Sequence, residues 1–505
     1  MPRRIHLVLL ILATAASACS RDETPPSADR ADARCEPLVH NEPAARRNVV
    51  FVLADTTRRD RVGLYGGPAR TPRFDAFARA GVYFTAVATQ APWTKPSIAT
   101  LFTGLLPDVH GVVSHPALRK DRRRIESDLL ADRYETLAES LAAAGYQTAA
   151  FVSNPWLRRR LGFDQGFEVW DQSMAGNATP GEVVTAAGLR WLREREGDPR
   201  PFFLYLHYMD AHAPYHAVSS DALRRRQAQI SGDTRPLTPR ARQTIAKLAR
   251  DERHRPLAAQ GIEPSRALFE LVYDAGVEHF DRALGPLLDG LSKRPEWGDT
   301  AVWITADHGE ALFERGFKGH GYGLHGDETG VPLAARLPGV ATRGPISCPV
   351  GLIDLRRTLC AYLGVECLGT DQGTSLFAPE IADPERVVVT EGVIGKPRNR
   401  AVRGRRYELL FEPDGRPASD PSPGGTIRFY DLASDPGESR DLLGSGLEGV
   451  ARQAFRRLRA VAETSSAGPH GQAETTELDE ATRRRLEALG YLDPAGGPPA
   501  EDPGE

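Results

Sequence analysis

Four short apolar runs constrain the fold more strongly than any other feature of this sequence. They cover residues 49–54, 148–153, 202–208 and 301–306, and each is bounded by polar or turn-forming residues. Continuous apolar runs of this length are typical of strands that are buried on both faces of a parallel sheet. Amphipathic helical patterns lie between them, the clearest over residues 268–291. This alternation predicts an α/β domain with a large, mostly parallel sheet.

The pattern changes after Leu376. Residues 386–392 and 405–412 are predicted to be strands of a small antiparallel sheet, followed by a helix over about 447–462. We therefore predict a catalytic domain over 48–380 and an α+β subdomain over 381–465. Residues 466–505 are polar and end in a Pro/Gly/Asp/Glu run, which predicts a mostly disordered tail with one short helix near 479–490.

The N-terminus has the order of an export signal. Arg3 and Arg4 precede an apolar run at 5–16, which closes on small residues before Cys19 and is too short to span a membrane. The residues Ala16-Ser17-Ala18-Cys19 resemble a bacterial lipoprotein box, although a simple cleaved signal is the alternative. We predict a signal peptide over 1–19, a disordered tether over 20–47, and a lipid anchor on Cys19. The expected location is the bacterial cell envelope, at the outer membrane or in the periplasm.

Cysteines and charge limit the partners and the compartment. The cysteines other than Cys19 are Cys35, Cys348, Cys360 and Cys367. In an oxidising compartment they are expected to form one or two disulfides, and the sequence leaves three pairings open. The alternative is that some of them are buried thiols. The formal net charge of -3 provides no overall positive potential that would attract nucleic acid, so nucleic acid is set aside as a partner. The basic stretch at 224–255 is interpreted as a solvated helical excursion.

Polar residues follow three of the predicted strands. Asp55 ends the first, Asp210 and His212 follow the third, and Asp307 and His308 follow the fourth. In open α/β sheets ligands bind at the carboxyl ends of the strands, whereas a single Asp there is as often a helix N-cap. Carboxylates with a neutral imidazole suit a divalent cation. We therefore predict metal binding by Asp55, Asp307 and His308.

A hydroxyl group stands at the start of a predicted helix near residue 94. Thr94 is followed by Lys95, by Pro96 in the first turn, and by an apolar run to Gly104. The positive end of a helix stabilises an anion or an alkoxide. Thr94 is thus a candidate nucleophile, with helix capping as the alternative.

Several blocks, in this order along the chain, together resemble the sulfatase family of the alkaline-phosphatase-like superfamily. The resemblance covers about residues 47–465 and rests on Val52-Leu53-Ala54-Asp55-Thr56-Thr57-Arg58, Thr94-Lys95-Pro96-Ser97 with His110-Gly111, His207-Tyr208-Met209-Asp210-Ala211-His212, Thr305-Ala306-Asp307-His308-Gly309-Glu310 with Gly319-His320-Gly321, and Phe429-Tyr430-Asp431-Leu432.

The resemblance implies the alkaline-phosphatase-like (sulfatase) fold and a role for each matched residue. It implies that Asp55, Asp307, His308 and Thr94 hold one divalent ion, and that His212 and His320 contact the transferred or leaving group as catalytic residues. Arg58 and Lys95 are expected to bind the substrate. The family implies calcium, while His308 in place of an amide ligand favours manganese or zinc, and magnesium is left open.

Three residues depart from the family pattern. The family carries Cys or Ser at position 94 and oxidises it to formylglycine, but threonine has a methyl group on its β-carbon and cannot give that aldehyde. Ile98 stands where an arginine is usual, and Thr56 stands in place of the second acid of the first block. No formylglycine is therefore expected.

Three functions follow from this interpretation. The leading one is a metal-dependent hydrolase of sulfate or phosphate esters, with a sulfated or phosphorylated glycan, lipid or small molecule as substrate. The second is a phosphoryl transferase or phosphodiesterase that uses Thr94. The third is an inactive lipoprotein that binds anionic glycans, against which the retained metal-ligand set speaks.

Overall fold

The structure is a computed structural model that describes residues 34–42, 46–113, 126–176, 179–213, 264–392, 399–413, 425–465 and 473–488. The predicted signal peptide, Cys19 and the basic stretch at 224–255 lie outside these ranges. Among the helices of the described residues, none combines the length and the apolar composition needed to cross a membrane.

An eight-stranded sheet forms the centre of the large domain, with the order β12-β2-β11-β8-β1-β7-β5-β6. The four predicted strands are adjacent and parallel in it, as β8, β1, β7 and β5, while β11 is antiparallel to both of its neighbours. The prediction of a large mixed, mostly parallel sheet is confirmed. The strands are β1 (Asn48–Ala54), β2 (Val82–Phe84), β5 (Gln147–Val152), β6 (Val169–Asp171), β7 (Phe202–Tyr208), β8 (Thr300–Thr305), β11 (Leu333–Arg336) and β12 (Gly344–Ile346).

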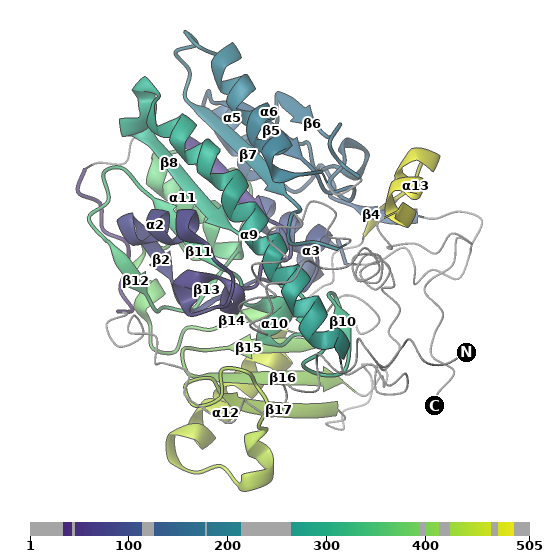
Figure 1. Cartoon of the computed structure of the whole chain (residues 1–505). Coiled ribbons are helices and arrows are strands. Elements are labelled where there is room, and N and C mark those ends of the chain that lie inside the picture. The colour runs from purple at the N-terminus through teal and green to yellow at the C-terminus, as the bar shows by residue number, and fades with distance from the viewer. Residues whose placement is uncertain are drawn as a thin grey trace, which may run out of the picture.

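Helices cover both faces of this sheet. Val49, Phe51 and Leu53 of β1 face one core, and Val50 and Val52 face the other, because successive side chains of a strand point to opposite faces. The first core is completed by α3 (Thr94–Thr103), α5 (Leu137–Ala143) and α11 (Ile353–Leu363). The second is completed by α2 (Pro72–Ala80), α6 (Gly181–Glu194) and α9 (Pro264–Ser292). Figure 1 shows α2 and the long helix α9 in front of the sheet.

A smaller antiparallel sheet forms the C-terminal subdomain, as predicted. Its strands run in the order β14 (Val388–Glu391), β15 (Arg400–Arg403), β16 (Tyr407–Pro413) and β17 (Gly425–Asp431). Helix α12 (Gly449–Ser465) packs Leu458 and Ala462 against Leu409 and Phe429 of this sheet. In Figure 1 this unit lies below the large sheet.

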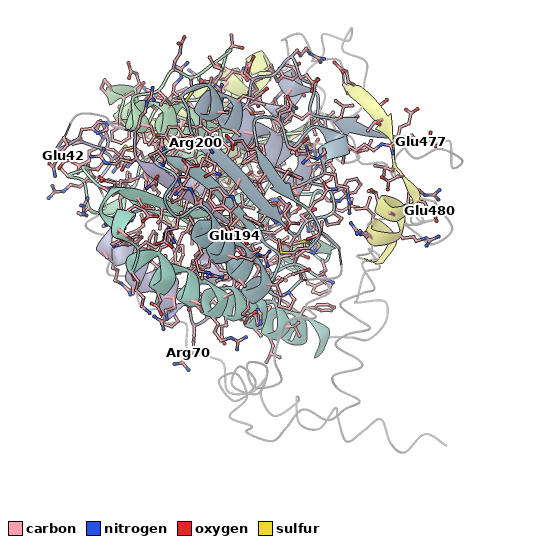
Figure 2. All side chains as sticks on the ribbon, turned by 90° about the horizontal axis from the view of Figure 1, so that it is seen from above. Glu42, Arg70, Glu194, Arg200, Glu477 and Glu480 are labelled. Carbon is pink, nitrogen blue, oxygen red and sulfur yellow. A yellow bond between two sulfur atoms is a disulfide. The ribbon has the colours of Figure 1, made fainter. Side chains whose placement is uncertain are left out.

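The ordered chain extends beyond the predicted domain at both ends. Residues 34–42, assigned above to a disordered tether, pack on the domain, where Leu38 is buried and His40 forms a β-bridge with Val340. Within the predicted tail, β18 (Glu474–Glu477) pairs with β4 (Glu126–Leu129), and α13 (Glu480–Ala488) buries Leu486. Figure 2 shows Glu477 and Glu480 at the outer edge of the molecule. Helix α13 corresponds to the short helix predicted near 479–490. The packing of residues 34–42 and the pairing of β18 depend on contacts distant in sequence, which composition alone does not reveal.

Two disulfides resolve the pairing that the sequence left open. Cys35 bonds to Cys348, and Cys360 bonds to Cys367. The first bond ties the N-terminal segment to the domain across a sequence separation of 313, whereas the second closes a separation of only 7.

Removal of the long-range disulfide is expected to cost more stability than removal of the short one. In the chain-entropy estimate, the longer loop restricts the unfolded chain more, by roughly 3 kcal/mol. The double variant Cys35→Ser/Cys348→Ser should therefore unfold at a lower temperature than Cys360→Ser/Cys367→Ser, as measured by circular dichroism without reductant. Equal midpoints for the two variants would contradict this expectation.

Candidate metal and nucleophile site

Two adjacent strands bring two carboxylates to the same edge of the sheet. Asp55 directly follows β1, and Asp307 follows β8 by two residues. The strands are parallel, with Leu53 opposite Thr305, so both chains leave the sheet at the same edge. Thr56 has a φ of 56°, in the left-handed region, and its N–H donates to Asp307 Oδ1 at 3.1 Å. This turn fixes the segment of Asp55 against the side chain of Asp307.

His308 completes a set of three candidate ligands. Its Nδ1 donates to the carbonyl oxygen of Gly309 at 2.8 Å, which leaves Nε2 as the nitrogen with a free lone pair. Nε2 lies 3.4 Å from Asp307 Oδ2 and 3.7 Å from Asp55 Oδ1. Within the described ranges, both of these buried oxygens lack a hydrogen-bond partner. One ligand atom from each residue lies within 4.8 Å of the others, and this donor set fits a divalent cation.

Burial decides the electrostatics of the three ligands, which are all 0% exposed. Burial raises the pKa of Asp55 well above its usual range, and the nearby carboxylate of Asp307 raises it further. Burial also raises the pKa of Asp307. It lowers the pKa of His308 to about 4, so the imidazole is neutral at pH 7, in the form that binds metals. A cation between these groups would offset the repulsion between the two carboxylates.

Thr94 stands beside the ligand set. It is the first residue of α3, after Trp93 in extended conformation, as the helix-start pattern predicts. Its Oγ1 lies 3.2 Å from His308 Nε2 and 3.5 Å from Asp55 Oδ2. The side chain is buried, so its hydroxyl group points into the cluster rather than into bulk water.

Asn154 belongs to the cluster although it was not singled out from the sequence. It comes two residues after β5, and its Nδ2 donates to Asp55 Oδ2 at 2.6 Å and to Thr94 Oγ1 at 3.2 Å. Its Oδ1 accepts from the backbone N–H of Trp156, which fixes the orientation of the amide. The sequence indicated this position, because Asn154 directly follows the predicted strand 148–153, as Asp55 directly follows the predicted strand 49–54.

Three histidine rings form a row that starts at the ligand set. The ring centroids of His308 and His320 are 4.5 Å apart, and those of His320 and His212 are 5.2 Å apart. His320 Nδ1 donates to Glu310 Oε2 at 2.9 Å, a partner that sequence reasoning did not assign. Burial lowers the pKa of His320 to about 3 and that of His212 to about 4. The structure therefore brings both predicted catalytic histidines to the site, as neutral rings.

Arg58 and Lys95 both donate hydrogen bonds to other groups of the protein. All three guanidinium nitrogens of Arg58 are bonded, to Asp60, to Glu314 and to the carbonyl oxygen of Glu310. Lys95 Nζ donates to Ser127 Oγ at 2.6 Å and to the carbonyl oxygen of Asp128 at 3.0 Å. The expectation that these two residues bind substrate gains no support from these contacts.

Replacement of Asp55 by Asn is expected to stabilise the protein in the presence of a chelator, because it removes one of two buried carboxylates. The folded-state pKa of Asp55 is raised above its usual value of 3.8. Its contribution to stability is therefore complete below that value and is lost as the pH rises through the folded pKa. At pH 7, Asp55→Asn should therefore unfold at a higher temperature than the unmodified chain.

Thermal unfolding in EDTA from pH 4 to pH 8 checks this expectation. The unmodified chain should lose stability as the pH rises, and Asp55→Asn should lose less. Addition of a divalent ion should stabilise the unmodified chain more than the variant. Identical pH dependence of the two proteins would contradict the expected effect of the Asp55 carboxylate.

Comparisons with known proteins agree with this geometry. The sequence profile of the family described as Sulfatase matches residues 47–365. A protein of Formosa agariphila named Sulfatase is 25% identical over 416 residues, which cover 73% of this chain and 77% of that protein. A solved protein in complex with its substrate D-glucosamine-2-N,6-O-disulfate aligns with a TM-score of 0.59 and 18% identity, over 83% of this chain and 97% of the other.

A second solved structure broadens the chemistry of the neighbours. The phosphonate monoester hydrolase of Agrobacterium radiobacter aligns with a TM-score of 0.57 and 19% identity, over 83% of this chain and 95% of the other. These structural likenesses support the alkaline-phosphatase-like fold. Because the profile covers more than half of the sequence and its matched range contains the whole metal and nucleophile cluster, this chain belongs to the sulfatase family of sulfuric ester hydrolases.

Proposed function

We propose that this chain hydrolyses sulfate or phosphate esters at a one-metal site with Thr94 as the nucleophile. The observation that carries the proposal is the position of Thr94 Oγ1, 3.2 Å from His308 Nε2 and 3.5 Å from Asp55 Oδ2. A divalent cation held by Asp55, Asp307 and His308 would lower the pKa of the Thr94 hydroxyl group and offset the charge of the ester. The positive end of α3 favours the same negative charge on Thr94 Oγ1.

The chain supplies groups for both halves of the proposed reaction. Thr94 releases its proton to solvent and Oγ1 bonds to sulfur or phosphorus. The bond to the alcohol oxygen breaks at the same time, and that oxygen takes a proton from His212 or His320. Asn154 Nδ2, 3.2 Å from Oγ1, orients this oxygen. Water then attacks the adduct, the bond to Oγ1 breaks, and Thr94 regains its proton. The products are the alcohol and the free inorganic anion.

His212 and His320 are the candidates for the proton donor to the leaving oxygen. Both rings are neutral at pH 7 because burial holds their pKa values at about 4 and about 3. An anionic ester beside them would raise both values, since an opposite charge favours the protonated ring. The carboxyl group of Glu310 bonded to His320 would favour the same form.

A phosphoryl transferase is the second candidate, and the identity of residue 94 favours it. A formylglycine hydrate can expel sulfate by returning to the aldehyde, whereas a threonine adduct persists until an acceptor attacks it. That acceptor is water in a hydrolase, and a hydroxyl group of a lipid or glycan in a transferase. Release of inorganic sulfate or phosphate, as opposed to a modified acceptor, separates the two.

The proposed substrate is an anionic ester carried by a glycan, a lipid or a small molecule. The solved neighbour with bound D-glucosamine-2-N,6-O-disulfate supports a sulfated glycan, whereas the phosphonate monoester hydrolase supports phosphorus esters. The identity of the metal is part of the test below, because the family resemblance implies calcium, whereas an imidazole beside two carboxylates favours manganese or zinc, and magnesium is left open.

Loss of the hydroxyl group at position 94 should abolish turnover. The full chain, Thr94→Val and Thr94→Ser would be assayed with nitrophenyl sulfate, phosphate monoester and phosphate diester, each with the four metals. Thr94→Val keeps a similar volume and should lower kcat by about 10³-fold or more, while Thr94→Ser keeps the nucleophilic oxygen and should stay active. Full activity of Thr94→Val would contradict the proposal. Metal binding without turnover of any ester, including sulfated glycans, would favour the glycan-binding alternative.

We further propose that the chain is exported and anchored through a lipid on Cys19. Two disulfides are consistent with an oxidising compartment. Expression of the full chain in a bacterium fed a labelled fatty acid should place the label on the protein and the protein in the membrane fraction. Cys19→Ser should lose both, and unchanged labelling of this variant would contradict the anchor.

A further inference from the structure

A second cluster of potential metal ligands lies on the opposite face of the sheet from α3. It consists of Glu182 at the start of α6, Asp210 just after β7, and His279 on α9. His279 Nδ1 is bonded to Asp210 Oδ1, and His279 Nε2 lies 3.3 Å from Glu182 Oε1. One ligand atom from each of the three residues lies within 4.8 Å of the other two.

An unsatisfied buried oxygen points to a missing partner in this cluster. The side chain of Asp210 is 0% exposed. Its Oδ1 accepts from the Gly181 N–H at 3.0 Å as well as from His279, whereas its Oδ2 has no hydrogen-bond partner in the part of the chain that the structure describes. Leaving a buried carboxylate oxygen unpaired is costly, so such atoms are usually found with a donor or a cation.

The start of α6 approaches this oxygen closely. A β-carbon added at Gly181 would lie 2.6 Å from Asp210 Oδ2, so only glycine lets the helix begin at this point. Glu182 follows directly and is half exposed, which leaves its carboxylate free to turn toward an ion and opens one side of the cluster to solvent. The cluster thus combines two buried ligands with one adjustable ligand.

We propose that Glu182, Asp210 and His279 bind a second divalent ion, of the zinc or manganese type, separate from the site at Asp55, Asp307 and His308. An imidazole nitrogen with two carboxylates is a ligand set that zinc and manganese accept, whereas calcium takes six to eight oxygen ligands. Water can complete the coordination on the side of Glu182. His279 can present either ring nitrogen, because Nδ1 lies beside Asp210 and Nε2 lies 3.3 Å from Glu182 Oε1.

The ion would connect three elements around the turn that carries His212. Helix α9 packs directly on this turn, because a β-carbon at Gly276 would lie 2.5 Å from the carbonyl oxygen of Asp210. The turn itself is closed by the N–H of His212, which donates to the carbonyl oxygen of Met209 at 3.1 Å. An ion at Asp210 would therefore hold α6 and α9 against the segment that places His212.

The test isolates the second site by removing the first. The full chain with Asp55→Asn/Asp307→Asn would be stripped with a chelator and titrated with zinc, manganese and calcium. We expect one equivalent of zinc or manganese to bind, with a higher unfolding temperature, and we expect cobalt to give visible absorption bands from the same site. Addition of Glu182→Gln or His279→Asn should weaken binding by about tenfold or more.

Glu194→Gln is the matched control, since Glu194 is an exposed carboxylate at the last position of α6, labelled in Figure 2. It should leave zinc binding unchanged. Because Glu182 is half exposed, Glu182→Gln should fold like the parent, which its unfolding temperature without metal would verify. The proposal is overturned if the Asp55→Asn/Asp307→Asn chain binds no zinc or manganese, if it binds calcium instead, or if Glu182→Gln and His279→Asn bind as tightly as Glu194→Gln.

Discussion

The structure of the site depends on two carboxylates that are held close together without contact with water. Asp55 and Asp307 leave neighbouring parallel strands at the same edge, and neither is exposed. Their repulsion opposes this arrangement, so the sheet register and the left-handed turn at Thr56 must enforce it. The same burial keeps His308 neutral and leaves one oxygen of each carboxylate unpaired. A cation bound between these groups would stabilise a site of this kind.

Much of this arrangement could be predicted, since it follows from strand polarity. Continuous apolar runs marked β1, β5, β7 and β8 to within about one residue, and parallel strands place their terminal residues along one edge. Other features depend on contacts distant in sequence that have no local signature. The bond of Cys35 to Cys348 and the pairing of β18 with β4 are of this kind. Asn154 is a different case, because its position after a predicted strand is visible in the sequence, but an asparagine there is also a common helix N-cap or turn residue.

Substrate binding by Arg58 and Lys95 stays a prediction, because a motif does not determine where a long side chain points. A motif transfers the identity of a residue, but the direction of a long side chain is set by its neighbours. Here the guanidinium of Arg58 forms ion pairs with Asp60 and Glu314. Lys95 lies over the ring faces of Trp93 and Trp156 and donates to Ser127. The short side chains at 55, 94, 307 and 308 have little freedom, which is why the backbone alone decides where they meet.

The carboxyl edge of the sheet gathers polar groups toward both of its faces. Asp55, Thr94 and Asp307 meet on the side of α3, whereas Asp210 turns toward α6 and α9. Between the two clusters lies His212, two residues beyond Asp210 and next to the ring of His320. A shift in the turn at 209–212 would therefore move a proposed proton donor without moving Asp55, Asp307 or His308. Through this one turn the packing of α9 would affect the proposed chemistry at Thr94, which would give a physical role to a cluster that lies outside the nucleophile site.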